Sequence, residues 1–467
     1  MRSSVVLLVV LVVSLAARFA NINRPEKIIF DELVITKFMN KIREREFLFD
    51  VFPPLGKMYL TAASGLVHWT VPSNLTHVGQ ELPPGSGFAQ VRAINAVLGG
   101  ISSMMVSVVC LEGGITAWPA LVGGLMNGLD ILSTIQSRVM MPDTFMVLLE
   151  QIAFFFAMKS WNAAKRKSRA TPLLWMLLAG VASGSAVATK WTSYAVVVII
   201  SSISFFGIPP FLTHGGMAWP TVLSFYAAAA STYYFFFDLY LRWCNRSGEH
   251  DNFTTIPFQA SLIGSNHAVD SEPMEPWMKV YEYNKLMWMY SRGIRGDTKS
   301  EPSWIDWILN QRTTIYVIEK YEASSRRVTT IVNPAVSLTI SGSLLTFTVV
   351  LFLYVRYLRH KGSNYQALRQ TLQRGSVYIL AWIGSMLPTL AVFRCGPIYQ
   401  YLPALFFATL LTAQNLELLM PKLKAAVSIV VILAIVAAFA LWSPWVYFTE
   451  ISLAYHSRLL AMEGWQR

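Results

Sequence analysis

Long apolar stretches recur from one end of the chain to the other. Those long enough to approach the width of a bilayer lie at about 4–20, 91–112, 114–132, 143–158, 172–189, 192–208, 217–240, 335–355, 376–393, 399–419 and 425–446. Charged residues gather in the connections between these stretches. The pattern predicts an all-α polytopic membrane protein with about eleven transmembrane helices.

The composition agrees with a membrane protein. Hydrophobic residues make up 54% of the 467 positions and charged residues 14%, whereas soluble domains contain about 25% charged residues. The net charge of +12 does not indicate a nucleic-acid partner, because the basic residues lie in short connections, where they set topology. The three cysteines are scattered and no Cys-x-x-Cys or His-x-x-His pair occurs, so we expect no protein-built metal site.

Basic residues and glycosylation sequons together predict the orientation. Clusters of Lys and Arg without an intervening acidic residue occur at 159–169, 356–374 and 422–424. They share one side of the membrane if the N-terminus is cytosolic. The sequons at Asn74, Asn245 and Asn252 fall on the opposite side. We therefore expect a multi-pass protein of the endoplasmic reticulum membrane.

This topology divides the chain into modules. They are an N-terminal membrane module at 1–240 that contains a lumenal loop at 21–90, a lumenal loop at 241–334, a four-span module at 335–446 and a lumenal tail at 447–467. The first apolar run leaves two interpretations, a membrane span or a signal peptide cleaved near the small residues of Ser14–Ala17. Residue 21 onward is lumenal in both.

Two adjacent carboxylates, Asp31 and Glu32, follow the first apolar run. Charges at a membrane rim are costly unless they are solvated or functional. The segment from Asp31 to Asp50 has apolar residues on one helical face and basic residues on the other, which predicts an amphipathic interfacial helix. From the residues alone, Asp31 is either a general base or the N-cap of this helix, and Asp50 is a cap or the partner of Lys57.

Several motifs resemble one family in its own order. Phe30-Asp31-Glu32 followed by Asp50-Val51-Phe52-Pro53-Pro54-Leu55-Gly56-Lys57 resembles the first lumenal loop of the protein O-mannosyltransferases, which are dolichyl-phosphate-mannose-dependent enzymes of the C-type membrane glycosyltransferase superfamily. Further similar motifs are Gln136-Ser137-Arg138 with Asp143, Lys190-Trp191, Phe258-Gln259-Ala260-Ser261-Leu262, Asn333-Pro334 and Tyr399-Gln400-Tyr401-Leu402-Pro403-Ala404-Leu405.

The chain also departs from the family. Phe52 and Gln400 stand where the family usually has His. Eukaryotic members carry a β-trefoil MIR domain of roughly two hundred residues after the seventh span, and the loop at 241–334 is too short to hold one. The chain therefore resembles a short member that lacks the MIR domain.

The resemblance implies roles for particular side chains. Asp31 is the expected general base, and Glu32 is expected to orient it or to raise its pKa by repulsion. Basic residues at lumenal helix ends would hold the donor phosphate, although snorkelling to the interface is the ordinary role of such residues. These candidates are Arg138 and Lys190, then Arg92 and Arg394. We expect Gln136 and Asp143 to orient Arg138, and Tyr399 and Tyr401 to line the donor or acceptor site.

The implied reaction is transfer of mannose from dolichyl phosphate mannose to Ser or Thr hydroxyls of secretory-pathway proteins, with inversion and without a cofactor. The expected partners are the dolichol-linked donor, membrane lipid, protein acceptors and a second mannosyltransferase in a homo- or heterodimer. Two alternatives stay open: another acceptor, or a non-catalytic subunit of such a dimer. A transporter would predict internal repeats and charges at mid-membrane, and neither is found in the sequence.

Overall fold

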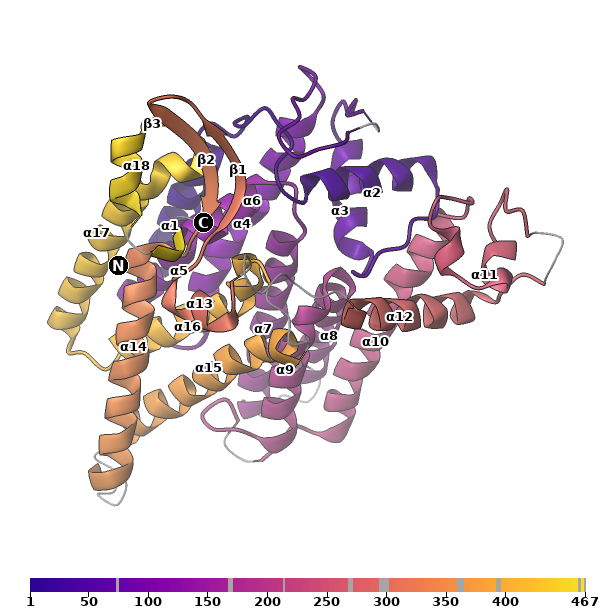
Figure 1. The fold of residues 1–467 in the computed structure, drawn as a ribbon. Coiled ribbons are helices and arrows are strands. Elements are labelled where there is room, and N and C mark those ends of the chain that lie inside the picture. The colour runs from indigo at the N-terminus through magenta and orange to yellow at the C-terminus, as the bar shows by residue number, and fades with distance from the viewer. Residues whose placement is uncertain are drawn as a thin grey trace.

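A computed structural model of the chain describes residues 1–72, 75–166, 171–212, 215–267, 272–293, 302–358, 365–391, 396–460 and 463–465. Helices account for most of the regular structure (Figure 1). In the described part the α-helices are α1 Ser3–Phe19, α2 Glu32–Glu44, α3 Leu55–Gly65, α4 Phe88–Glu112, α5 Ala117–Gly128, α6 Ile131–Arg138, α7 Asp143–Lys165, α8 Thr171–Thr189, α9 Tyr194–Phe206, α10 Trp219–Trp243, α11 Ile256–Ala260, α12 Pro276–Gly293, α13 Trp304–Leu309, α14 Pro334–Leu353, α15 Gln366–Ala391, α16 Leu402–Leu416, α17 Pro421–Val446 and α18 Leu453–Leu459. Short 3-10 turns include η1 Trp191–Ser193, η2 Asp251–Phe253, η5 Ile398–Tyr401 and η6 Glu463–Trp465, and a single π-helical turn, η3 Tyr354–Leu358, follows α14.

Every predicted apolar stretch falls on one or more of these helices. By length and composition, five helices of the described part can cross a membrane, namely Phe88–Glu112, Asp143–Lys165, Thr171–Thr189, Pro334–Tyr357 and Pro421–Val446. The two peripheral helices α14 and α17 bury only 22% of their most apolar windows. They expose large side chains such as Leu338 and Val430, a surface that suits lipid and not water.

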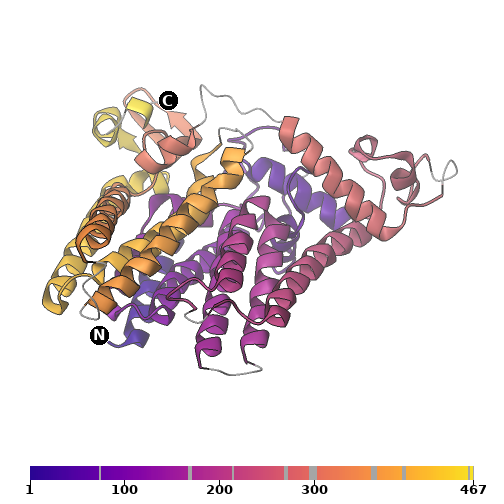
Figure 2. The ribbon, with the colours of Figure 1, turned by 90° about the horizontal axis from the view of Figure 1, so that it is seen from below.

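The helix α16 forms the centre of the bundle. Each of its residues from Leu402 to Leu416 is buried, because the sequence is apolar on every side. The ring of Phe154 on α7 meets those of Phe406 and Phe407 edge-on, at 6.2 and 5.5 Å between centroids. Seen from below, the C-terminal helices in orange and yellow lie beside the N-terminal helices as one body (Figure 2).

A small sheet corrects the expectation of a purely α-helical chain. The strands β1 Thr314–Lys320, β2 Ser324–Thr330 and β3 Ile451–Ser452 form an antiparallel sheet in the order β1-β2-β3. The two longer strands are rich in β-branched residues and are joined by a short turn, which is an ordinary hairpin signal. Figure 1 shows the sheet at the same end of the bundle as α2 and α3.

The interfacial helix expected after Asp31 is present as α2 and ends earlier than expected. Arg45 adopts the left-handed conformation at its C-cap, with φ of 62°. The chain then runs extended through Phe47 and Phe49, whose rings pack against Tyr283 of α12. Ring packing from α12 thus fixes the segment that leads from α2 into α3.

Candidate active site

An open pocket of about 570 Å³ lies beside the start of α2. Segments distant in sequence form its wall: the start of α2, the turn before α3, the start of α7, the end of α8, the start of β1 and η5. Its ionisable lining groups are three carboxylates and two ammonium groups, from Asp31, Asp50, Asp143, Lys57 and Lys190. The pocket therefore brings together four of the predicted site residues, Asp31, Asp143, Lys190 and Tyr399.

Asp31 lines this pocket and does not cap α2. It occupies the N-cap position, but its side chain accepts no capping hydrogen bond. Burial raises the pKa of the Asp31 carboxyl, and the carboxylates of Asp143 and Asp50 add to this effect. The Lys190 ammonium and a hydrogen bond with the Tyr399 side chain oppose it. A carboxyl group with a raised pKa that faces a pocket is suited to accept a proton.

The residue before Asp31 is held in a strained conformation. Phe30 has φ of +48°, a left-handed conformation that costs a non-glycine residue roughly 1–2 kcal/mol. Its ring stacks on Tyr316 of β1 at 4.2 Å between centroids. This contact offsets the strain and fixes the direction in which the chain enters α2, so strand β1 supports the position of Asp31.

A buried hydrogen-bonded chain holds Lys190. Its Nζ lies 2.8 Å from Asp143 Oδ1, and Gln136 Nε2 donates to Asp143 Oδ2 at 3.1 Å. The Tyr316 hydroxyl in turn donates to Gln136 Oε1 at 2.6 Å. The expectation that Gln136 and Asp143 orient Arg138 is therefore wrong, because both serve Lys190.

A second ion pair fixes the turn before α3. Lys57 Nζ donates to Asp50 Oδ2 and, at 3.0 Å, to the backbone oxygen of Phe52. Burial lowers the pKa of Lys57, and its partner Asp50 opposes that shift. The interpretation of Asp50 as the partner of Lys57 is confirmed.

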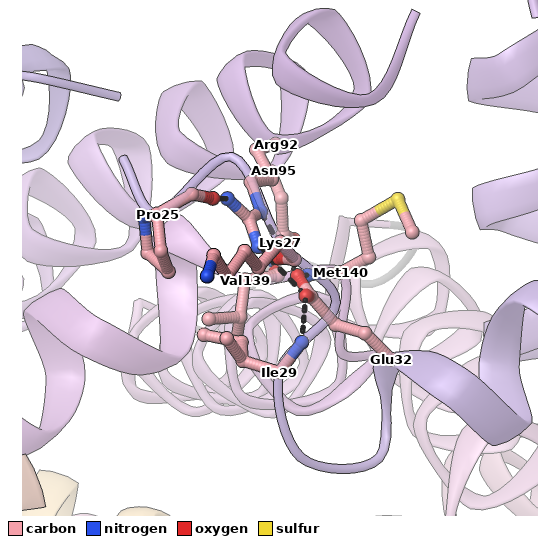
Figure 3. A network of polar contacts seen from close by, with 8 residues as sticks. All are labelled: Pro25, Lys27, Ile29, Glu32, Arg92, Asn95, Val139 and Met140. Carbon is pink, nitrogen blue, oxygen red and sulfur yellow. Dashed lines mark hydrogen bonds and ion pairs between the residues drawn. The ribbon is translucent and has the colours of Figure 1, made fainter. Parts of the chain in front are cut away.

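Glu32 does not line the pocket, and its carboxylate lies in a network of its own (Figure 3). Its two carboxylate oxygens accept from Arg92 Nε at 3.0 Å and Arg92 Nη2 at 2.7 Å. They also accept from the backbone N–H groups of Ile29 and Met140. The carboxylates that add most to the raised pKa of Asp31 are those of Asp143 and Asp50. Glu32 thus anchors the start of α2, which corrects its expected role as a neighbour that tunes Asp31.

The other predicted phosphate ligands lie outside the pocket. The guanidinium of Arg92 is 1% exposed and is used by Glu32 and by the carbonyls of Pro25 and Lys27. Arg138 donates to the carbonyls of Arg18, Ala20 and Asn21. Arg138 therefore has a structural role at the end of α1, where carbonyls that the helix terminus leaves unpaired need donors. Arg92 instead holds the loop between α1 and α2 against Glu32. The expectation that these two arginines bind the donor phosphate is therefore wrong.

The remaining predicted residues separate into three groups. Tyr399 lines the pocket, whereas Tyr401 is buried and its hydroxyl accepts from Trp382 Nε1 at 3.1 Å. Arg394 and Asn74 lie outside the described residues. Asn252 is exposed and Asn245 is half-buried.

Sequence reasoning missed the contribution of the hairpin to the site. Thr313, Thr314 and Ile315 line the pocket, and Tyr316 connects Phe30 to Gln136. The alternation of residues 314–330 could have indicated the strands, but nothing local in sequence indicates what they contact.

The arrangement can support displacement at a carbon that bears a phosphate leaving group. Asp31 places a carboxyl group and Lys190 an ammonium group within the same pocket. No cluster of three or more His, Cys, Asp or Glu side chains that could hold a metal occurs among the described residues.

Comparison with known proteins places these features in a family. Residues 8–241 match the family model described as dolichyl-phosphate-mannose-protein mannosyltransferase, and residues 276–465 match the C-terminal four-transmembrane region of protein-O-mannosyltransferase. Only residues 242–275 separate the two matches, too few for a MIR domain.

Curated relatives are similar over about half of the chain. Protein O-mannosyltransferase 1 of Drosophila melanogaster is 24% identical over 53% of this chain and 29% of its own length. Dolichyl-phosphate-mannose–protein mannosyltransferase 4 of Candida albicans is 22% identical over 58% of this chain and 37% of its own length. The chain thus spans about a third of the length of these relatives.

A solved structure shares the fold across the whole chain. It is that of the S. cerevisiae protein O-mannosyltransferase Pmt1-Pmt2 complex bound to the sugar donor, with a TM-score of 0.88, 13% identity, and coverage of 100% of this chain and 93% of that one. Half of the chain matches the first family model and most of the remainder matches the second. The chain therefore belongs to the dolichyl-phosphate-mannose-protein mannosyltransferase family.

Proposed function

We propose that this protein transfers mannose from dolichyl phosphate mannose to Ser or Thr hydroxyls of proteins in the lumen of the endoplasmic reticulum. The observation that carries the proposal is the position of Asp31, a carboxyl group with a raised pKa, in the same pocket as Lys190. Family membership and a donor-bound structure of the same fold support the choice of donor.

The proposed chemistry is one inverting displacement. The acceptor oxygen forms a bond to the anomeric carbon, the bond from that carbon to the phosphate oxygen breaks, and the hydroxyl proton passes to Asp31. The phosphate leaves with the electron pair. One unit of negative charge thus moves from Asp31 to the phosphate, and the total charge within the pocket stays constant.

Lys190 is the proposed ligand of that phosphate. Its ammonium is 7% exposed, and a buried cation acts on developing charge more strongly than one in water. Asp143 holds the ammonium at 2.8 Å, so it is in place before the charge develops. Arg92 and Arg138 are not part of the proposed phosphate site.

The proposed setting is an eleven-span protein with a cytosolic N-terminus and the pocket at the lumenal rim. Support comes from the coincidence of eleven apolar stretches with helices and from the position of α2 and the sheet at one end of the bundle (Figure 1). The relative of the same fold is a Pmt1-Pmt2 complex, and we propose that this chain likewise pairs with a mannosyltransferase.

The test uses membranes that contain the full chain, dolichyl phosphate mannose labelled in the sugar, and a peptide rich in Ser and Thr. Label on the peptide with the unaltered protein is the expected result. Asp31→Asn should lower the rate at least about a hundredfold, since general bases contribute 10²–10⁴.

The matched control is Asp238→Asn, because Asp238 pairs with Arg242 on α10 and lies outside the pocket. Label transfer by Asp238→Asn should equal that of the unaltered protein. Equal label from the Asp31→Asn variant would overturn the role of Asp31. Transfer of label to lipid alone would refute the proposal that the acceptor is a protein.

A further inference from the structure

The ammonium of Lys190 lies close to two aromatic rings, a feature that the proposed mannose transfer does not explain. Its Nζ lies 4.5 Å from the centroid of the Tyr399 ring and 5.3 Å from that of Phe52. Its ion-pair partner is Asp143, whose Oδ1 lies 2.8 Å away. Two aromatic faces and one carboxylate thus surround the ammonium, and all four residues line the pocket.

The ring of Phe52 is exposed, but its backbone is firmly held. Phe52 is 39% exposed, and its carbonyl accepts from the buried ammonium of Lys57 at 3.0 Å. Lys57 also binds Asp50, whose backbone N–H donates to the Tyr283 hydroxyl at 3.1 Å. The turn from Asp50 to Phe52 is therefore clamped, although the ring itself faces the pocket.

Such clamping has a physical consequence for Lys190. A flexible four-carbon side chain with a strongly hydrated ammonium loses rotamer freedom when it binds an anion. Aromatic faces attract an ammonium and displace water from it. Two aromatic rings next to the ammonium, one of them on a firmly held backbone, would therefore favour its position before an anion arrives.

We propose that Phe52 is a positioning residue for the donor phosphate: with Tyr399 it holds the Lys190 ammonium in a desolvated position where it binds the phosphate of the polyprenyl lipid. The proposal rests on the proposed function, and it adds a determinant of donor affinity. Phe52 touches Lys190 rather than the reacting atoms. Its loss should raise the donor KM more than it lowers kcat.

The first experiment measures binding of dolichyl phosphate, with dolichol as the phosphate-free control, to the purified full chain in lipid nanodiscs. Phe52→Leu should weaken dolichyl phosphate binding by about five- to thirtyfold, the range between an exposed and a desolvated cation–π contact. Phe52→Tyr keeps an aromatic face and should bind like the unaltered protein. Phe235→Leu removes an exposed ring of α10 outside the pocket and should also bind like the unaltered protein.

The second experiment is a double-mutant cycle with Lys190→Gln. If Phe52 acts through the ammonium, Phe52→Leu should have no further effect on dolichyl phosphate binding once Lys190 is neutral. An effect of Phe52→Leu that persists in the Lys190→Gln background would overturn the proposal, because the ring would then contact the lipid or sugar directly. Tighter binding by Phe52→Leu would also overturn it.

The two proposals fail in different ways. If the unaltered protein binds dolichyl phosphate no better than dolichol, the proposed function fails. If it binds dolichyl phosphate and Phe52→Leu binds it equally well, the proposed function stands and the role of Phe52 is refuted. A parallel rise in the KM for donor and for acceptor peptide would show general disruption of the pocket and would likewise refute it.

Discussion

At the scale of the residue, the protonation of Asp31 should control the rate. Burial raises the pKa of its carboxyl above the ordinary value of about 3.9. Because the base must be ionised to accept a proton, kcat/KM for mannose transfer should fall as the pH drops through this raised pKa. The measurement is the pH profile of kcat/KM. An apparent pKa of its acidic limb no higher than the pKa of a free aspartate would contradict the prediction.

The same shift predicts an effect on stability with a definite sign. A carboxyl whose pKa is raised on folding favours the folded state below its unfolded pKa, and this stabilisation is lost as the pH rises through the folded pKa. At neutral pH the ionised Asp31 therefore opposes folding. Asp31→Asn should raise the unfolding temperature at pH 7 relative to the unaltered protein, and the difference should shrink at acidic pH. A lower unfolding temperature at pH 7 would contradict this sign.

Glu32 should matter for folding rather than for proton transfer. Removing one partner of a buried ion pair costs about 3–5 kcal/mol because it leaves a buried charge unpaired, so Glu32→Gln should lower the unfolding temperature strongly. Adding Arg92→Met should recover part of the loss, since it removes the unpaired guanidinium. Thermal unfolding of the purified variants measures both effects. Glu81→Gln, at an exposed ion pair with Lys27 of the same loop, is the control and should change little.

At the scale of the element, close packing of α8 on α10 depends on glycine. A Cβ at Gly184 would lie 2.3 Å from the backbone oxygen of Ala229, whereas one at Gly342 of α14 would meet nothing within 4 Å. Gly184→Ala should therefore force α8 and α10 apart and destabilise the protein by roughly 1–3 kcal/mol. Gly342→Ala is the matched control. Equal folded yields and unfolding temperatures of the two variants would refute this packing.

The elements differ in how far local sequence predicted them. Within the described residues the eleven apolar stretches fall on helices, because a run of apolar residues is compatible with few other structures. Five helices of this part are long and apolar enough to cross a membrane. The amphipathic pattern after Asp31 likewise predicted α2. The hairpin of β1 and β2 was missed, since strand signals are short and depend on what the sheet contacts. Its function in holding Phe30 through Tyr316 has no local signature.

At the scale of the whole molecule, the orientation predicts a glycan at one sequon. Asn252 is exposed on the connection after α10, which is lumenal if the N-terminus is cytosolic. We expect Asn252 to be glycosylated in microsomes, with an electrophoretic shift that endoglycosidase and Asn252→Gln both abolish. As a control, a sequon placed in the connection between α16 and α17 should stay unmodified. Modification of the control sequon alone would show that the protein has the opposite orientation.

The sequence by itself determined the membrane character, the helices, the family and the general base candidate, because hydrophobic runs and short motifs are local properties. It also determined that Asp50 and Lys57 could pair, since seven positions separate them. Tertiary structure decided which of the candidate cations lies in the pocket. Arg92, Arg138 and Lys190 are all basic residues at predicted helix ends, and only packing shows that the donors of the two arginines are used by Glu32 and by backbone carbonyls. The fold leaves Lys190 in the pocket with Asp31, and its ammonium lies close to the rings of Phe52 and Tyr399. The function of a charged side chain depends on what is buried around it. Contacts between segments distant in sequence determine that environment, from 47 positions for Lys190 and Asp143 to 120 for Arg138 and Arg18.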